Sequence, residues 1–480
     1  MNSYLPLTGY RILAVEQYGA GPYGSQYLSE LGAEVIKIEA PGGGDVSRRT
    51  SPFTLGEADS EFFQTFNSNK KSLVLDLKTE SGRAVFEKLV GTADAVLNNL
   101  RGDLPEKLGL DYASLKHLKP ALVCAHLSAY GRDNERARWP GYDYLMQAEA
   151  GYCHLTGEPG TPPARFGLSV VDFMTGMNMA IALLAGLAGA QRSGQGCDVD
   201  VSLFDVALHQ LSYPATWYLN NGHVTTRLPR GAHPATVPAQ SYRTADGWIY
   251  VLCMLPKFWE ALCQGLGRPE LIDDPRFIDI PARREHRDQL TEELDAAFMT
   301  RTTQEWMAMF GGKIPVAPVN DLAQGLDNPF VEQVGMIQHL DHPQKPGLKK
   351  LSCPIKINGQ RPPSRPSPAL GADSESLLRE LGYDPVFLKP EPFPDETRRP
   401  TRTGLKSVPP RPSPDHDDGR SRGRGDQAGA AGRRAGAGGG LEAERDFGLV
   451  SQYPPGQEIH LHQLKGTGRA GCFAESRGAL

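Results

Sequence analysis

The sequence has few cysteines, and none of them is arranged to pair or to bind a metal. The seven cysteines are an odd number scattered over 480 residues, with no Cys-x-x-Cys pair and no Cys/His cluster of metal-ligand spacing. This pattern excludes a disulfide framework and a zinc site. We therefore expect reduced thiols, no bound metal and a cytoplasmic location.

Strong charge and a leader segment are also lacking. The formal net charge is only -5, and no long basic face precedes the C-terminal stretch, so we expect no nucleic-acid partner. Residues 1–16 lack the basic start and apolar stretch of a signal peptide. Residues 173–190 are uncharged and reach the lower limit for a membrane span, but they include Thr175, Asn178 and three glycines. We expect a buried helix there and no membrane.

Strand and helix signals alternate through the first 200 residues. Short apolar runs predict strands, and amphipathic segments at 25–32 and 81–93 predict helices between them. This alternation favours an α/β fold with a parallel sheet. The predicted strands are 11–16, 33–39, 72–77, 93–99 and a run within 120–131, followed by a strand that leads into a helix over 196–212.

The pattern changes in the second half of the chain. Two β-rich runs around a turn at 245–247 predict a hairpin over 239–254, and 257–267 and 286–310 are amphipathic helices. We expect a large domain over 1–224, a smaller α+β domain over 225–330, and a return to the large domain over 331–390. Residues 391–480 are rich in Arg, Gly, Pro and Ala, which predicts a disordered tail.

A glycine-rich turn, GAGPYG at 19–24, follows the first predicted strand and precedes a helix. Together with Glu39, twenty residues after Gly19, it fits the fingerprint of a dinucleotide-binding turn. Pro22 lacks an amide N–H, and no constellation for hydride transfer accompanies the turn, which disfavours NAD. CoA contains a nucleotide diphosphate and would suit the same geometry. A tight turn without any ligand is the remaining interpretation.

Asp172 is a lone carboxylate where an apolar run meets the long apolar helix. It is either an N-cap of that helix or a carboxylate that the positive helix end keeps ionised as a nucleophile. Gly167 and Gly176 would leave room for a substrate. Tyr142 and Asp143 precede it by about thirty residues, and Tyr142 is either a hydrogen-bond donor in the site or a half-buried core aromatic.

Basic and amide side chains accompany two other predicted strands. Because ligands gather at the carboxyl ends of parallel strands, these side chains suit phosphate, although exposed cations are commonly just solvated. They are Asn99, Arg101 and Lys107 after one strand, and Lys70, Lys71 and Lys78 around another.

Taken in order, these segments resemble class III CoA-transferases, the CaiB/BaiF group that includes formyl-CoA transferase. The resemblance runs from about residue 7 to 384. It implies a Rossmann-like large domain made from both ends of the chain, a smaller domain between them, and an interlocked homodimer. The segments that carry it are 7–45, 67–83, 97–112, 141–151, the Asp172 segment, 194–208, 242–251 and 368–384.

The resemblance also implies the chemistry. CoA would move from an acyl-CoA donor, such as succinyl-CoA, to a carboxylic acid through intermediates on Asp172. CoA thioesters would be the substrates, with no tightly bound cofactor. The implied CoA contacts are Gly19, Ala20, Leu75, Lys78, Asn99, Leu100, Arg101, Lys107, Tyr142 and Asp143.

The sequence departs from relatives of this family in three places. Ala40 stands where formyl-CoA transferase has a basic residue, and residues 230–240 replace its glycine-run loop, which disfavours formate and oxalate. Tyr142 stands where α-methylacyl-CoA racemases of the same family have a histidine, and tyrosine, with a pKa of about 10, is a poor proton shuttle. Three alternatives to a CoA-transferase remain. They are a racemase of the same family, an NAD-dependent oxidoreductase and a non-catalytic CoA-binding protein.

Overall fold

The computed structural model describes residues 4–384, which all lie within one compact unit. The disordered tail expected over 391–480 lies outside the described residues. The domain boundaries stay a prediction, and the elements below are described by their own contacts.

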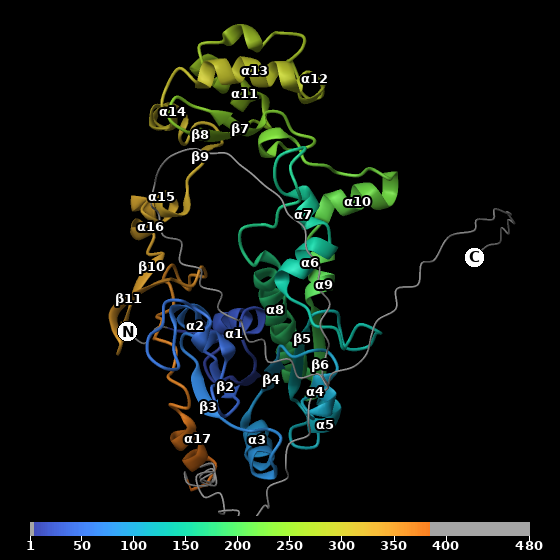
Figure 1. Ribbon diagram of the computed structural model, residues 1–480, viewed down its shortest axis with the longest axis vertical. Coiled ribbons are helices and arrows are strands. Elements are labelled where there is room, and N and C mark those ends of the chain that lie inside the picture. The colour runs from blue at the N-terminus through green and yellow to red at the C-terminus, as the bar shows by residue number, and fades with distance from the viewer. Residues whose placement is uncertain (1–3, 385–480) are drawn as a thin grey trace, which may run out of the picture. The chain divides into compact units, whose positions relative to one another are not determined.

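A six-stranded parallel sheet forms the centre of the N-terminal part (Figure 1). This confirms the α/β class, although the strands are shorter than the apolar runs that predicted them. The strand order β3-β2-β1-β4-β5-β6 changes direction between β1 and β4, and in such sheets ligands bind at that point, beyond the strands' carboxyl ends. The strands are β1 (Arg11–Val15), β2 (Glu34–Glu39), β3 (Lys71–Val74), β4 (Ala95–Asn98), β5 (Val123–Ser128) and β6 (Cys197–Ser202).

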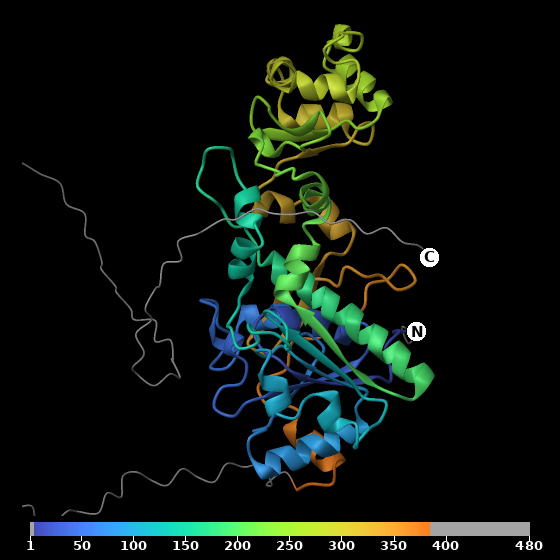
Figure 2. The same ribbon diagram turned by 90° about the vertical axis from the view of Figure 1, so that its right-hand side faces the viewer.

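Helices cover both faces of this sheet. On one face α1 (Ala20–Glu30) and α8 (Val170–Ser193) pack on β1, β4 and β5. On the other face α3 (Glu80–Thr92), α5 (Tyr112–Leu115) and α17 (Ser374–Glu380) complete a second apolar core. Figure 2 shows α8 along one side of the sheet and α3 with α17 on the other. Because α17 comes from the far end of the described chain, the helical layer on this second face combines residues 80–115 with residues 374–380.

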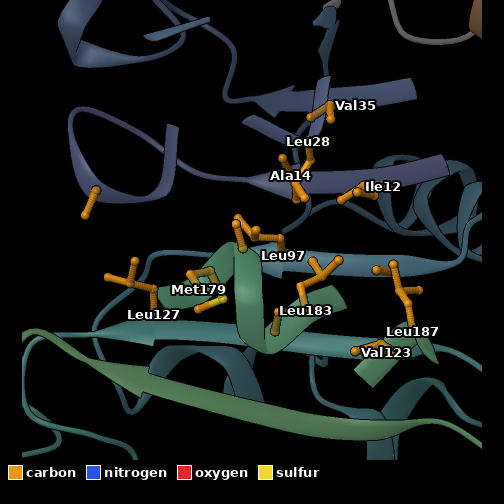
Figure 3. Close-up of a cluster of buried hydrophobic side chains, with 14 of the residues drawn as sticks. Ile12, Ala14, Leu28, Val35, Leu97, Val123, Leu127, Met179, Leu183 and Leu187 are labelled. Carbon is orange, nitrogen blue, oxygen red and sulfur yellow. The ribbon is translucent and has the colours of Figure 1, made fainter. Parts of the chain in front are cut away.

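Helix α8 contains residues 173–190, the uncharged segment that reaches the lower limit for a membrane span. Within residues 4–384 it alone is long and apolar enough to cross a membrane, and 44% of its apolar window is buried. Met179, Leu183 and Leu187 lie against Val123 and Leu97 of the sheet (Figure 3). Core packing of this kind accounts for the apolar residues on the side of the helix that faces the sheet.

Helix α1 begins five residues earlier than the periodicity predicts, at Ala20 and within the glycine-rich turn. Pro22 is the third residue of the helix. A proline is tolerated there because N–H groups of the first turn have no partner within the helix. Gly21 and Gly24 of the turn are therefore helical residues, and Gly19 is the N-cap of the helix.

A separate group of elements follows residue 238. As predicted, β7 (Ala239–Arg243) and β8 (Trp248–Leu252) form an antiparallel hairpin, to which β9 (Val316–Pro318) adds a third strand. Three helices enclose an apolar core with this sheet. They are α11 (Pro256–Gly265), α13 (Arg287–Phe298) and α14 (Thr303–Phe310), and the short helix α12 (Ile280–Glu285) precedes α13.

The remaining elements are short. A second hairpin, β10 (Ile337–His342) with β11 (Lys345–Leu351), packs Leu340 and Leu348 on Leu55. The other helices are α2 (Glu61–Phe66), α4 (Leu104–Lys107), α6 (Asp143–Glu149), α7 (Tyr152–Leu155), α9 (Leu203–His209), α10 (Ser212–Asn221), α15 (Leu322–Leu326) and α16 (Pro329–Gln333).

Candidate active site

The Asp172 carboxylate lies against the glycine-rich turn. A Cβ atom added at Gly19 would lie 2.7 Å from Oδ2 of Asp172, so any larger residue would displace the carboxylate. One turn further along α8, a Cβ at Gly176 would lie 2.5 Å from the carbonyl oxygen of Ala20 and 3.0 Å from the backbone nitrogen of Gly24. Gly176 therefore lets α1 and α8 cross closely. Its position in the sequence had suggested that it leaves room for a substrate, but backbone atoms of α1 fill that space.

Asp172 is the third residue of α8 and not its N-cap, which is Ser169. Ser169 makes no side-chain capping bond. Instead, Oδ2 of Asp143, from α6, accepts the backbone N–H of Asp172 at 3.0 Å. A carboxylate from a neighbouring helix thus caps α8, and the Asp172 side chain is left to face Gly19.

Burial, followed by repulsion from Asp143, raises the pKa of Asp172 from 3.8 to about 7. From its place at the positive end of the helix we expected this carboxylate to be kept ionised. With a pKa of about 7 it is only partly ionised near neutral pH, because desolvation of the charge outweighs the favourable helix end. Once deprotonated, a carboxylate that has lost most of its hydration is a reactive nucleophile.

Gln147 connects Asp143 to the segment that leads into α8. The side-chain amide of this fully buried residue donates to Oδ1 of Asp143 at 2.5 Å and to the carbonyl of Leu168 at 3.1 Å. Its oxygen accepts the N–H of Phe166 at 2.8 Å. One buried amide therefore fixes α6, residues 166–168 and, through Asp143, the start of α8.

Tyrosines lie in the neighbourhood of Asp172. Tyr142 is 65% exposed, so it is not a half-buried core aromatic. Tyr18 adopts a positive φ of 68° and its N–H donates to Asp45 at 3.0 Å. Its pKa is raised by burial and then by the charges of Tyr144, Asp172 and Tyr142. The side chains of Tyr142, Tyr144 and Asp172 therefore lie within electrostatic reach of Tyr18.

Asn99, an expected CoA contact, holds the turn from the side of β4. Its side-chain oxygen accepts the N–H of Gln17 at 2.9 Å, and its nitrogen donates to the carbonyl of Gln17 at 2.7 Å. Both ends of the amide are thus used to position the turn. Ala20 is buried beside Gly176 and Leu100 is half-buried.

The expected phosphate contacts fall into two groups. Arg101 and Lys107 both pair with Asp103, at 2.5 Å each, and the bond from Arg101 is the main reason why the pKa of Asp103 lies far below its usual range. Lys107 also lines a cavity of about 960 Å³ beyond β4, β5 and β6 that does not include Asp172. Lys78 is exposed after β3, and Leu75 beside it is buried.

Two of the three lysines near β3 are engaged in ion pairs. Lys70 is buried and pairs with Glu16 at 2.8 Å, and burial is the main reason that its pKa is lowered to about 8. Lys71 pairs with Glu34. The sequence pattern left these residues as phosphate ligands or solvated cations, but their carboxylate partners give both of them a structural role.

Glu39 does not take the part that a dinucleotide fingerprint assigns to it. Its carboxylate is buried and pairs with Arg48 at 2.7 Å, and it also accepts from the hydroxyl of Ser72 at 2.6 Å. A ribose would have to compete with a buried ion pair. Because Glu39 is already engaged, it is not available to bind the ribose of NAD, and this disfavours the NAD interpretation of the turn.

Within residues 4–384, His, Cys, Asp and Glu side chains form no cluster of three or more that would hold a metal ion. The residues gathered around Asp172 are glycines, tyrosines and a second carboxylate. Such an arrangement can perform nucleophilic chemistry with a carboxylate at a closely approached backbone turn.

Comparison with known proteins identifies the family. The model of CoA-transferase family III matches residues 7–374. The chain belongs to CoA-transferase family III. It is therefore a transferase enzyme, and proteins of this family use CoA thioesters as substrates.

Relatives of this CoA-transferase span most of its length. A succinate–glutarate CoA-transferase of Agrobacterium fabrum is 33% identical over 79% of this chain and 96% of its own. The human succinyl-CoA:glutarate CoA-transferase is 30% identical over 80% and 88%. The crystal structure of a CaiB/BaiF family protein from Brucella suis matches with a TM-score of 0.69, 31% identity, and coverage of 79% and 100%.

Sequence reasoning missed several residues of this site. Gln147 lies four residues after Asp143 on α6, and that spacing places both on one helix face. The spacing was a usable signal. No signal in the sequence indicated Tyr18 or Asp45, because their contact depends on how the β1–α1 turn meets the segment after β2.

Proposed function

We propose that this CoA-transferase moves CoA between carboxylic acids through covalent intermediates on Asp172. The observation that carries the proposal is the half-buried Asp172 carboxylate, placed against Gly19 at the turn expected to approach CoA. The donor is an acyl-CoA such as succinyl-CoA, and the acceptor is a short carboxylic acid. The activities of the relatives, a succinate–glutarate and a succinyl-CoA:glutarate CoA-transferase, support this choice.

The first half-reaction transfers CoA to the enzyme. The Asp172 carboxylate attacks the thioester carbonyl, the C–S bond breaks, and a mixed anhydride and CoA thiolate result. The thiolate then attacks the Asp172 carbonyl of the anhydride, which releases the donor as a free carboxylate and leaves an aspartyl-CoA thioester.

The second half-reaction reverses these steps with another acid. The acceptor carboxylate attacks the aspartyl-CoA thioester and forms a new anhydride. The CoA thiolate attacks the acceptor carbonyl, which gives the new acyl-CoA and restores the Asp172 carboxylate. One thioester replaces another, so no ATP, metal or tightly bound cofactor is required.

CoA contacts are part of the proposal. Gly19, Ala20 and Leu100 would offer backbone and apolar surface. Exposed Lys78 would meet phosphate groups together with Arg101 and Lys107, which both pair with Asp103. Asn99 and Asp143 would contribute by holding the turn and α8, because their polar atoms bond to Gln17, Gln147 and Asp172. Tyr142 is exposed and would border the thioester. Leu75 would contribute only through its backbone.

Trapping tests the mechanism. The enzyme is mixed with succinyl-CoA, quenched with hydroxylamine and digested, and a hydroxamate is expected on the peptide that contains Asp172. Asp172→Asn should fold and form no hydroxamate. Label on a different carboxylate, or near-normal transfer by Asp172→Asn, would refute the mechanism.

The racemase alternative is tested separately. Tyr142 occupies the position of the racemase histidine, and an exposed tyrosine is a poor base at neutral pH. A 2-methylacyl-CoA incubated with the enzyme in heavy water should gain no α-deuterium. Exchange as fast as CoA transfer would favour the racemase.

We also propose a cytoplasmic interlocked homodimer with no membrane or nucleic-acid partner. Helices α10, α15 and α16 contain no buried residue, while Leu219, Leu322 and Phe330 on them are 79%, 81% and 61% exposed. Apolar side chains exposed to this extent favour a subunit interface. Light scattering after size-exclusion chromatography should give twice the chain mass, and a monomer would contradict the dimer.

A further inference from the structure

Arg165 lies in the segment that leads into α8, seven residues before Asp172. Its guanidinium carbon is 4.4 Å from the centre of the Tyr144 ring, and its Nη1 donates to the carbonyl of Phe166 at 3.0 Å. Phe166 is in turn bonded to the buried amide of Gln147. The backbone beside Arg165 is therefore anchored to the same amide that holds Asp143.

The charge of Arg165 has no carboxylate partner within 4.0 Å among residues 4–384. The side chain is exposed, so the charge is solvated in the free enzyme. Arg165 also does not pair with Asp172, and the nucleophile is not neutralised by it. A planar guanidinium over an aromatic ring offers its N–H groups edge-on, in the geometry that a carboxylate accepts with two oxygens.

Tyr144 links this cation to the reaction centre. The hydroxyl of Ser169, the N-cap of α8, lies 3.5 Å from the Tyr144 hydroxyl. The charges of Tyr144 and Asp172 both act on Tyr18. Arg165, Tyr144 and Ser169 thus form one polar group at the start of α8, where Ser169 precedes Asp172 by three residues.

We propose that Arg165, supported by Tyr144 and Ser169, binds the second carboxylate of a dicarboxylic acyl group whose first carboxylate reacts at Asp172. This inference rests on the proposed function and specifies its substrate class. A dicarboxylate is selected because its distal charge meets a cation. A monocarboxylate of the same length leaves that cation without a partner.

The half-reaction with a single donor tests this site. Succinyl-CoA and butyryl-CoA differ mainly in that a distal carboxylate replaces a methyl group. Wild-type enzyme should form the Asp172 hydroxamate faster with succinyl-CoA at low donor concentration. Arg165→Gln should lower that rate by about 10- to 100-fold with succinyl-CoA and leave butyryl-CoA nearly unchanged, because one charge-assisted contact is lost.

Two further variants make the result specific. Arg165→Lys keeps the charge and should retain part of the preference for succinyl-CoA. Arg136→Gln is the matched control, because Arg136 also lies over an aromatic ring, 4.6 Å from the centre of Trp139, but is already paired with Glu149. Its loss should not alter the preference.

Each outcome is informative. Equal loss with both donors, or an unchanged preference in Arg165→Gln, would overturn the role of Arg165 while leaving the Asp172 label intact. A wild-type enzyme that reacts as well with butyryl-CoA would also overturn it. Absence of the Asp172 label with both donors would instead refute the proposed function.

Discussion

The backbone N–H of Asp172 donates to the Asp143 carboxylate, 3.0 Å away, so two acidic residues meet at the start of α8. Asp143 satisfies an N–H of the first helical turn that would otherwise lack a partner. The same contact places a negative charge beside the carboxylate that we propose as the nucleophile. Asp143 therefore positions Asp172 and also makes its ionisation more difficult.

The rate of the first half-reaction should rise with pH and level off above about pH 7. Only the deprotonated Asp172 can attack, and burial followed by Asp143 raises its pKa to about 7. In Asp143→Asn the repulsion is removed, so the midpoint should move to lower pH, although the maximum rate should fall because α8 is held less well. Hydroxamate yield against pH measures both. A midpoint that stays in place would show that Asp143 does not act on Asp172 through charge.

Protein stability should show the opposite dependence on pH. The native pKa of Asp172, about 7, exceeds its ordinary value of 3.8, so native Asp172 retains a proton between these values that the unfolded chain has lost. The stability that this proton contributes is present at low pH and lost as pH rises through about 7. At about 1.4 kcal/mol per pH unit, the cost reaches about 4 kcal/mol.

Asp172→Asn removes this titration. Its melting temperature relative to wild type should therefore increase between pH 5 and pH 8. Asp246→Asn is a useful control, because Asp246 is a distant carboxylate whose pKa is lowered mainly by bonds to Thr303, and it should not reproduce the gain at high pH. A difference between Asp172→Asn and wild type that does not change with pH would contradict the raised pKa.

Gly19→Ala should impair catalysis more than folding. The added Cβ would lie 2.7 Å from Oδ2 of Asp172, and a side-chain carboxylate can move away at little cost to the fold. A displacement of about 1 Å can cost about 100-fold in rate. Gly91→Ala on α3 is the control, because no atom lies within 4 Å of the position that its Cβ would take. Unchanged hydroxamate formation in Gly19→Ala would refute the close contact.

Calorimetry with CoA distinguishes two reasons for such a loss. If only the nucleophile is displaced, CoA should bind Gly19→Ala as it binds wild type. If Gly19 also contacts CoA, as the family resemblance implies, affinity should fall together with the rate. The control Gly91→Ala should leave both unchanged.

The first five strands of the sheet could be predicted because each is a short apolar run between helical segments, whereas in β6 two aspartates alternate with valines. The position of Asp172 could be predicted for a similar reason, since a lone carboxylate in an apolar stretch is conspicuous. The residue that accepts the backbone N–H of Asp172 could not be predicted, because Asp143 lies 29 residues earlier on a separate helix. Likewise Asn99 stands in the expected place but clamps Gln17, which depends on how β1 and β4 meet.

Buried ion pairs were the least predictable feature. Lys70 belongs to a Lys-Lys pair that indicates solvent exposure, yet it is buried against Glu16, 54 residues away. Glu39 fits a dinucleotide fingerprint by spacing and is instead bonded to Arg48. Spacing along the chain identifies the residue types of a site, but the tertiary partner decides what each residue does.

Two glycines on α8 should respond in opposite ways to alanine. A Cβ at Gly176 would lie 2.5 Å from the carbonyl oxygen of Ala20, and backbone atoms cannot rotate away as side chains do. Helices α1 and α8 would have to separate, at a cost of about 1–3 kcal/mol. A Cβ at Gly189 meets nothing within 4 Å, so Gly189→Ala should gain up to about 1 kcal/mol from helix propensity.

Urea unfolding and hydroxamate formation should separate these variants. Gly176→Ala should unfold at lower urea concentration and also lose activity, because Asp172 lies one helical turn before Gly176 and moves with the helix. Gly189→Ala should match or exceed wild type in both measurements. Equal behaviour of the two variants would show that the close crossing of α1 and α8 does not hold Asp172 in place.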